Sequence, residues 1–106
     1  MYYELKINDK EYKLRLDVRS VVSLEKELGK NPLFVFTKKV PETEEMVLIL
    51  YHSLKHYYPE ATIEEAYAIL DEWIDSGKLL TEFVSVCVEI YTISGLFKPE
   101  GKEEKN

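Results

Sequence analysis

Two histidines come nearest to a metal-binding or catalytic spacing in this chain. His52 and His56 stand four residues apart in a segment of helical periodicity, which places both imidazoles on the same side of a helix. Ser53 occupies the position where a metalloprotease motif carries its general-base glutamate, and no third ligand follows at a suitable spacing. Because two ligands are too few for a zinc site, we predict that the pair lies on a solvated helix face.

Three carboxylates, those of Asp71, Glu72 and Asp75, crowd the end of a later predicted helix. Carboxylates that share a cleft can serve acid–base catalysis, because repulsion raises the pKa of one of them. Trp73 and Ile74 are predicted on the opposite, inner side, so we expect these carboxylates to face water. The sequence has no glycine-rich phosphate loop, paired-cysteine motif or nucleophile elbow. We therefore predict a chain that is not an enzyme, with no catalytic, metal or cofactor-binding residues.

The charge and the single cysteine exclude several kinds of partner and location. A formal net charge of -6 repels phosphate backbones and anionic membranes, so neither nucleic acid nor a membrane is an expected partner. No apolar run reaches the roughly 20 residues that span a bilayer, and no secretory signal pattern opens the chain. Cys87 lies in an apolar run and is expected to be a small buried hydrophobe, which fits a reducing cytoplasm.

The periodicity of the hydrophobic residues predicts an α+β, mostly helical fold. We expect one globular domain over residues 1–97 and a disordered charged tail over 98–106. Polar and apolar residues alternate from Tyr3 to Leu16 on either side of a polar stretch at 8–11, which predicts a two-stranded antiparallel β-hairpin with one solvated face. Four to five packed helices are expected to follow, over 18–28, 33–36, 43–58, 63–76 and 78–93.

Local signals mark where several of these helices begin and end. Asp17 is suited to cap the first helix, and Gly29 is suited to end it. Thr62 to Glu65 has the pattern of a capping box at the start of the fourth helix. Behind that box, the side expected to face the core is formed by Ile63, Ala66, Tyr67, Leu70, Trp73 and Ile74.

The last predicted helix carries its polar residues in one narrow stripe, and the rest of its circumference is apolar. Such a helix is either central to its own domain or partly covered by another subunit, and both alternatives stay open here. We also expect self-association into a homo-oligomer. The candidate partner-binding residues are Leu79, Phe83, Val86, Val88, Ile90 and Ile93, together with Leu33, Phe34 and Phe36 of the short second helix.

The run Leu24-Glu25-Lys26-Glu27-Leu28-Gly29 is followed by a small helical segment at Asn31-Pro32-Leu33. With the hairpin before it and the helix after it, this order resembles the tail assembly chaperones of long-tailed bacteriophages and prophages, over roughly residues 3 to 95. The resemblance implies a non-catalytic protein of the bacterial host cytoplasm that binds and shields the tape-measure protein. It also implies that the chain helps to recruit tail-tube protein and is absent from the finished particle.

Two other functions remain open at this point. One is a structural tail protein, such as a terminator or connector, that stays in the particle. The other is a small regulatory adaptor unrelated to phage. Many members of the tail assembly chaperone family are made in a short form and in a longer, frameshifted form. Codons for Glu104-Lys105-Asn106 can spell a slippery heptamer, so a longer form of this chain is a hypothesis that the gene's nucleotides would test.

Overall fold

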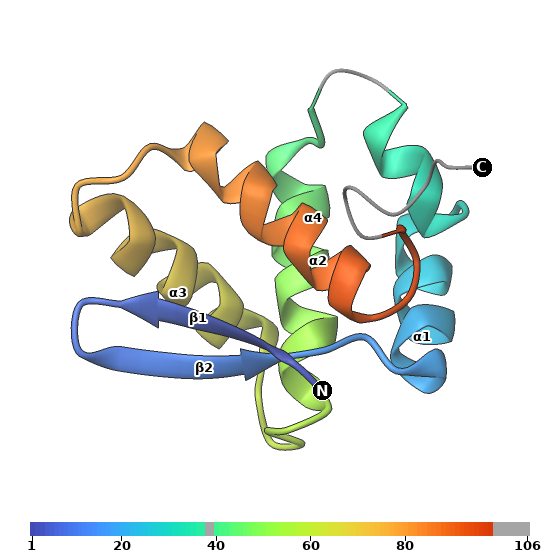
Figure 1. The fold of residues 1–106 in the computed structure, drawn as a ribbon, viewed down its shortest axis with the longest axis horizontal. Coiled ribbons are helices and arrows are strands. Elements are labelled where there is room, and N and C mark those ends of the chain that lie inside the picture. Colours follow the sequence, from blue (N-terminus) through green and yellow to red (C-terminus); the bar gives the residue numbers. More distant parts are fainter. Residues whose placement is uncertain (38–39, 99–106) are drawn as a thin grey trace.

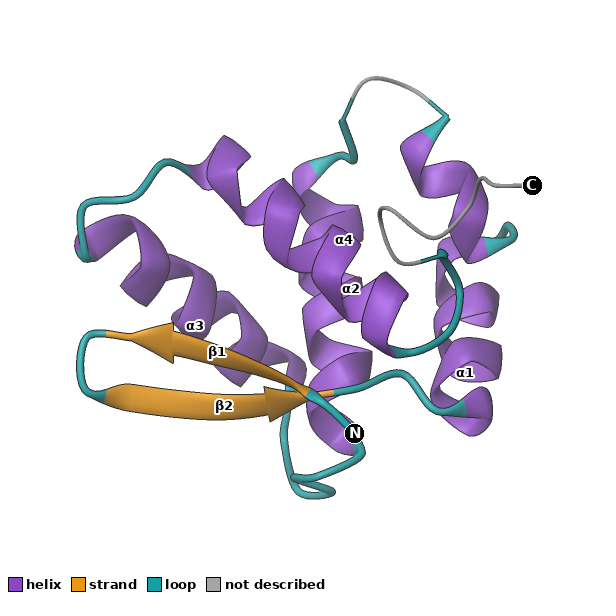
Figure 2. Ribbon diagram, in the orientation of Figure 1, coloured by secondary structure: helices purple, strands orange, loops and turns teal. Residues whose placement is uncertain are grey.

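The computed structural model describes residues 1–37 and 40–98 of the chain. The predicted class is confirmed: an antiparallel hairpin is followed by a mostly helical body (Figures 1 and 2). Of the tail predicted over 98–106, only Lys98 is described, and 99–106 lie outside the described residues. The elements are strands β1 (Tyr3–Ile7) and β2 (Lys10–Leu14), helices α1 (Val18–Leu28), α2 (Thr43–Lys55), α3 (Ile63–Asp75) and α4 (Phe83–Ile93), and the 3-10 turns η1 (Pro32–Phe36) and η2 (Leu80–Glu82).

The hairpin has the two faces that its alternating sequence predicts. β1 and β2 pair antiparallel from Tyr3 opposite Leu14 to Ile7 opposite Lys10. Asn8 adopts a positive φ of 55° in the short connection, a conformation that asparagine tolerates and that tight hairpin turns favour. One face of the hairpin is buried, because β1 packs against α4 and β2 packs against α2. The other face is exposed to solvent. The buried residues of the two strands are Leu5, Ile7 and Leu14.

The predicted ends of α1 and the predicted start of α3 are confirmed. The carboxylate of Asp17 accepts a hydrogen bond of 2.8 Å from the backbone N–H of Ser20, and Gly29 ends α1 at φ 73°. At α3, the Glu65 N–H donates to the Thr62 hydroxyl at 3.2 Å, and the Thr62 N–H donates back to the Glu65 carboxylate at 3.0 Å. These bonds satisfy N–H groups that have no partner inside the helix.

Helix α2 forms the centre of the fold and packs against α1, α3, α4 and β2. Figure 1 shows it running through the middle of the molecule, with α1 on one side of it and the hairpin and α3 on the other. It ends at Lys55, three residues before the predicted end near Tyr58. Tyr57 and Tyr58 instead donate their N–H groups to the Leu54 carbonyl in a turn that precedes Pro59.

The prediction of which α3 residues face the core is partly wrong. Tyr67 and Ile74 are 48% and 44% exposed, whereas Ile69 is 5% exposed and belongs to the core. The buried stripe follows Ala66, Ile69, Leu70 and Trp73. Tyr67 and Ile74 each come one residue after a member of that stripe, about 100° further round the helix, and so fall at its edge.

Helix α4 starts later than predicted, because residues 80–82 form the separate 3-10 turn η2. The indole N–H of Trp73 donates a hydrogen bond of 2.8 Å to the Leu79 carbonyl, which ties this connection to α3. The buried residues of α4 are Phe83, Val86, Cys87, Ile90 and Tyr91. No helix in the described part of the chain combines the length and apolarity that crossing a membrane requires.

Candidate functional site

The prediction that both histidines lie on a solvated helix face is wrong for His52. The residue is 7% exposed, and its Nε2 lies 2.5 Å from the carboxylate of Glu27, near the end of α1. The ring of Tyr51 packs edge-on against it, with the ring centroids 4.8 Å apart. The burial arises because α1 packs alongside α2, a contact that the spacing of the histidines does not reveal.

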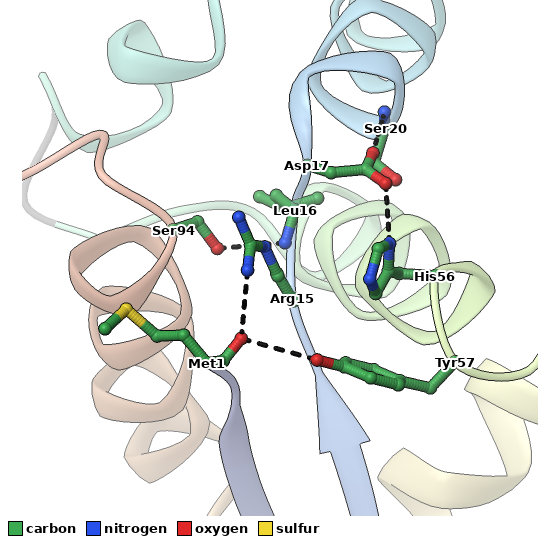
Figure 3. Close-up of polar contacts among 8 residues, drawn as sticks. All are labelled: Met1, Arg15, Leu16, Asp17, Ser20, His56, Tyr57 and Ser94. Carbon is green, nitrogen blue, oxygen red and sulfur yellow. Dashed lines mark hydrogen bonds and ion pairs between the residues drawn. The ribbon is translucent and has the colours of Figure 1, made fainter.

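His56 makes a similar contact at the other end of α1. Its Nδ1 lies 2.6 Å from Oδ2 of Asp17, while Oδ1 of the same carboxylate caps α1 through Ser20 (Figure 3). The pKa of Asp17 is held below its ordinary value, mainly by the hydrogen bond from the Ser20 N–H and to a smaller extent by His56. The two histidines therefore join opposite ends of α1 to α2.

The same junction connects the hairpin to the end of α4. The N–H of Leu16 donates a hydrogen bond of 2.9 Å to the hydroxyl of Ser94, and the guanidinium of Arg15 donates at 3.3 Å to the Met1 carbonyl. The hydroxyl of Tyr57 reaches that carbonyl at 3.4 Å (Figure 3). These contacts bring together residues from both ends of the described chain and position the start of α1.

The contact between Asp17 and His56 joins a carboxylate to an imidazole, as two members of a nucleophilic triad do. A triad needs a hydroxyl or thiol hydrogen-bonded to the imidazole nitrogen that the carboxylate does not hold. Among the described residues, no hydroxyl or thiol makes such a bond to either histidine. Nor does the described part of the chain hold a group of three histidine, cysteine or acidic side chains placed to bind a metal ion. The geometry supports a structural role for the pair.

The three carboxylates at the end of α3 lie in different surroundings. Asp71 and Asp75 are exposed, as predicted, but Glu72 is half-buried and contacts the hairpin. Its carboxylate accepts hydrogen bonds from Lys10 at 2.5 Å and from the Tyr12 hydroxyl at 3.0 Å. The bond from Lys10 is the main reason that the pKa of Glu72 lies below its ordinary value. Glu72 therefore joins α3 to β2.

Cys87 lies in the core, as its apolar neighbours in the sequence predict. It is fully buried on α4, and this burial raises the pKa of its thiol far above the ordinary value. The thiolate is the reactive form of cysteine, so this side chain is inert in the folded chain.

Three of the nine candidate partner-binding residues are inaccessible in this fold. Phe83, Val86 and Ile90 are at most 2% exposed, because α4 packs its apolar side against α2 and β1. They form core contacts within the chain, and a partner cannot reach them in this conformation. For these three residues, the structure agrees with the alternative in which the last helix is central to its own domain.

The remaining candidates do not form one continuous surface. Val88, Ile93 and Phe36 are half-buried, and Phe36 packs on the ring of Tyr91 at a centroid distance of 5.1 Å. Leu33, Phe34 and Leu79 are exposed, by 40%, 57% and 65%. Leu79 precedes the start of α4, whereas η1 lies beside its end, and α4 is about 16 Å long (Figure 1). The exposed residues thus belong to two separate surfaces.

A hollow of about 430 Å³ was not predicted from the sequence. It lies between β2, the end of α2 and the outer side of α3. It is lined by Glu11, Tyr12, Leu54, Tyr58, Glu60, Ala61, Glu65, Ala68, Ile69 and Glu72. These residues come from three separate parts of the chain, and no short motif marks them.

The fold defines a small helical domain with a β-hairpin, and its described surface includes exposed apolar side chains on η1 and just before α4. No protein-family model matches the chain, and no curated protein or solved structure is significantly similar to it. The surface chemistry of the chain is therefore the basis for a functional proposal.

Proposed function

We propose that this chain is a phage tail assembly chaperone, a non-catalytic protein that shields an apolar helical segment of the tape-measure protein in the bacterial cytoplasm. In this role it also helps to recruit tail-tube protein. The observation that carries the proposal is the exposure of Leu33 and Phe34 on η1, a short helical turn whose other side is anchored in the core.

The anchoring of η1 makes it suited to hold an apolar partner. Pro32 and Val35 are buried, and the hydroxyl of Tyr91 donates a hydrogen bond of 2.9 Å to the Pro32 carbonyl. At the start of the turn, the Asn31 side chain accepts a bond of 2.9 Å from the Leu33 N–H. A main chain that is already held in place loses little conformational entropy when its exposed side chains bind, so exposed residues on a fixed turn favour association.

The neighbouring helix offers a second apolar pair. Val18 and Val22 are 81% and 44% exposed on α1, and their four-residue spacing places them on one side of the helix. α1 packs against η1. Aliphatic side chains at such spacing suit contact with an amphipathic helix, and the net charge of -6 favours solubility of the resulting complex.

The test is co-expression with the tape-measure protein encoded near this gene, followed by affinity capture. We expect the double substitution Leu33→Ser/Phe34→Ser to reduce capture and to send the tape-measure protein into the insoluble fraction. The control Tyr67→Ser/Ile74→Ser removes two side chains of similar exposure from α3 and should leave capture unchanged. Unchanged capture by the η1 variant would contradict the proposal.

Two further measurements separate this proposal from the alternatives. Mass spectrometry of purified particles should not detect a chaperone, whereas a terminator or connector would be present. Failure to bind any tape-measure or tail-tube protein would favour a regulatory adaptor. We also propose that the free chain self-associates through its exposed apolar residues, which light scattering measures as a mass above that of one chain.

A further inference from the structure

The hollow between the hairpin and α3 has an apolar floor and an open mouth. Leu54, Ala61 and Ile69 are buried side chains that line it from α2, the following loop and α3. Ala68 lies exposed on α3 at the same hollow, and its small side chain leaves the space above the floor unfilled. The volume of about 430 Å³ is enough for an aliphatic side chain together with part of its main chain.

Two tyrosines form the walls of this hollow, and hydrogen bonds hold both of them. The hydroxyl of Tyr12 donates to Glu72 at 3.0 Å, and the hydroxyl of Tyr58 accepts a bond of 2.9 Å from the backbone N–H of Lys13. The hollow is therefore formed before any ligand arrives, which lowers the entropy cost of binding.

The outer edge of β2 runs beside the same hollow. Because the Lys13 N–H points to Tyr58 and away from β1, the alternation of an antiparallel strand places the N–H and C=O of Glu11 on that outer edge too. Among the described residues, no main-chain group outside the hairpin bonds to them. An exposed strand edge of this kind is where an extended peptide adds to a sheet.

The rim of the hollow is acidic, and two of its carboxylates are available. Glu65 is engaged in the capping box of α3, and Glu72 is engaged by Lys10 and Tyr12. Glu11 and Glu60 have no ion pair or hydrogen bond through their side chains within residues 1–37 and 40–98. A cationic side chain beside them would therefore gain attraction without having to displace an existing partner.

From these features we infer that the groove binds a short extended peptide segment of another protein, in which an aliphatic residue is flanked by lysine or arginine. The aliphatic side chain lies on the floor, the main chain pairs with Glu11, and the basic side chains lie beside Glu11 and Glu60. This surface is separate from η1, and the inference holds whether or not η1 binds a tape-measure protein.

The probe for the test is a fluorescein-labelled peptide that alternates lysine with leucine, titrated with the full chain and followed by fluorescence anisotropy. We expect saturable binding, which Glu11→Lys/Glu60→Lys weakens by about tenfold or more. The control Glu25→Lys/Asp71→Lys changes the net charge by the same amount at exposed positions outside the groove, and should alter affinity by less than about twofold. Circular dichroism verifies that each variant is folded.

A second variant tests the shape of the groove independently of charge. Ala68→Trp places a large side chain at the mouth and should prevent binding. Peptides with glutamate in place of lysine, or serine in place of leucine, should not bind. The inference is overturned if the control pair weakens binding as much as the groove pair does, if the serine peptide binds equally well, or if no saturation appears up to about 1 mM.

Discussion

The hydroxyl of Tyr91, near the end of α4, donates a buried hydrogen bond of 2.9 Å to the carbonyl oxygen of Pro32, the first residue of η1. The two residues are 59 positions apart in the sequence. Together with the edge-on packing of Phe36 on the same tyrosine ring, this bond holds η1 against the last helix. The position of the exposed side chains of η1 thus depends on a contact with a residue that is distant in the sequence.

We expect Tyr91→Phe to lower the free energy of unfolding by about 1–3 kcal/mol, because it leaves the Pro32 carbonyl buried without a partner. Urea denaturation followed by circular dichroism measures the change. Tyr67→Phe removes a hydroxyl from a tyrosine that is 48% exposed and should have almost no effect. Equal stability of the two variants would show that the buried bond contributes nothing.

Phe83→Asp should unfold the chain rather than weaken a partner contact. Phe83 is fully buried and packs edge-on against Trp73 at a centroid distance of 5.2 Å. Truncation of a buried phenylalanine costs about 3–5 kcal/mol, a buried charge adds to that cost, and the whole stability of such a domain is about 5–15 kcal/mol. Phe34→Asp, at an exposed position, should keep its native circular dichroism; a folded Phe83→Asp protein would contradict the assignment of α4 to the core.

Asp17→Ala should lower the free energy of unfolding by about 1 kcal/mol at neutral pH, through loss of the α1 cap. Because the pKa of Asp17 in the folded chain lies below its ordinary value of 3.8, the unfolded chain binds the proton more readily. The stabilisation is therefore present above pH 3.8 and is lost as the pH falls through that value towards the lower folded pKa. The stability difference between wild type and Asp17→Ala should therefore shrink over that acidic range, and urea denaturation at a series of pH values measures it. A difference that stays constant with pH would contradict the prediction.

The thiol of Cys87 should react with a disulfide reagent only when the chain unfolds. Burial both excludes the reagent and keeps the thiol protonated, since its pKa is raised. The reagent releases one of its own thiols for each cysteine that reacts, and the absorbance of that thiol should rise slowly in buffer. The rate of this rise should increase with denaturant concentration, and in full denaturant the absorbance should correspond to one thiol per chain. Rapid labelling of the native protein would show that α4 opens locally.

The sequence predicted those features that depend on residues close together in the chain. Four such features involve only residues that are close in the sequence: the turn near Asn8, the cap at Asp17, the end of α1 at Gly29 and the capping box that begins at Thr62. The side chains of Asp17 and Thr62 accept hydrogen bonds from backbone N–H groups that the helices leave unpaired, and Asn8 and Gly29 adopt the positive φ that these turns require. The local sequence is therefore enough to place them.

Features that depend on packing between distant segments were not predictable in the same way. His52 is buried because Glu27, 25 positions earlier, meets it across the contact between α1 and α2. Whether the apolar side of α4 faced the core or a partner likewise depended on the arrangement of α2 and β1. The groove escaped prediction because Tyr12, Tyr58 and Ala68 become neighbours only after folding.

The dependence of η1 on Tyr91 also sets an order during synthesis. A nascent chain that has emerged only as far as α3 contains Leu33 and Phe34 but lacks the hydroxyl that fixes Pro32. We therefore expect the turn to gain this stabilising bond only after the ribosome has translated Tyr91 and released that part of the chain from its exit tunnel. If η1 binds a partner as proposed, that binding begins only when nearly all of the described chain has been made.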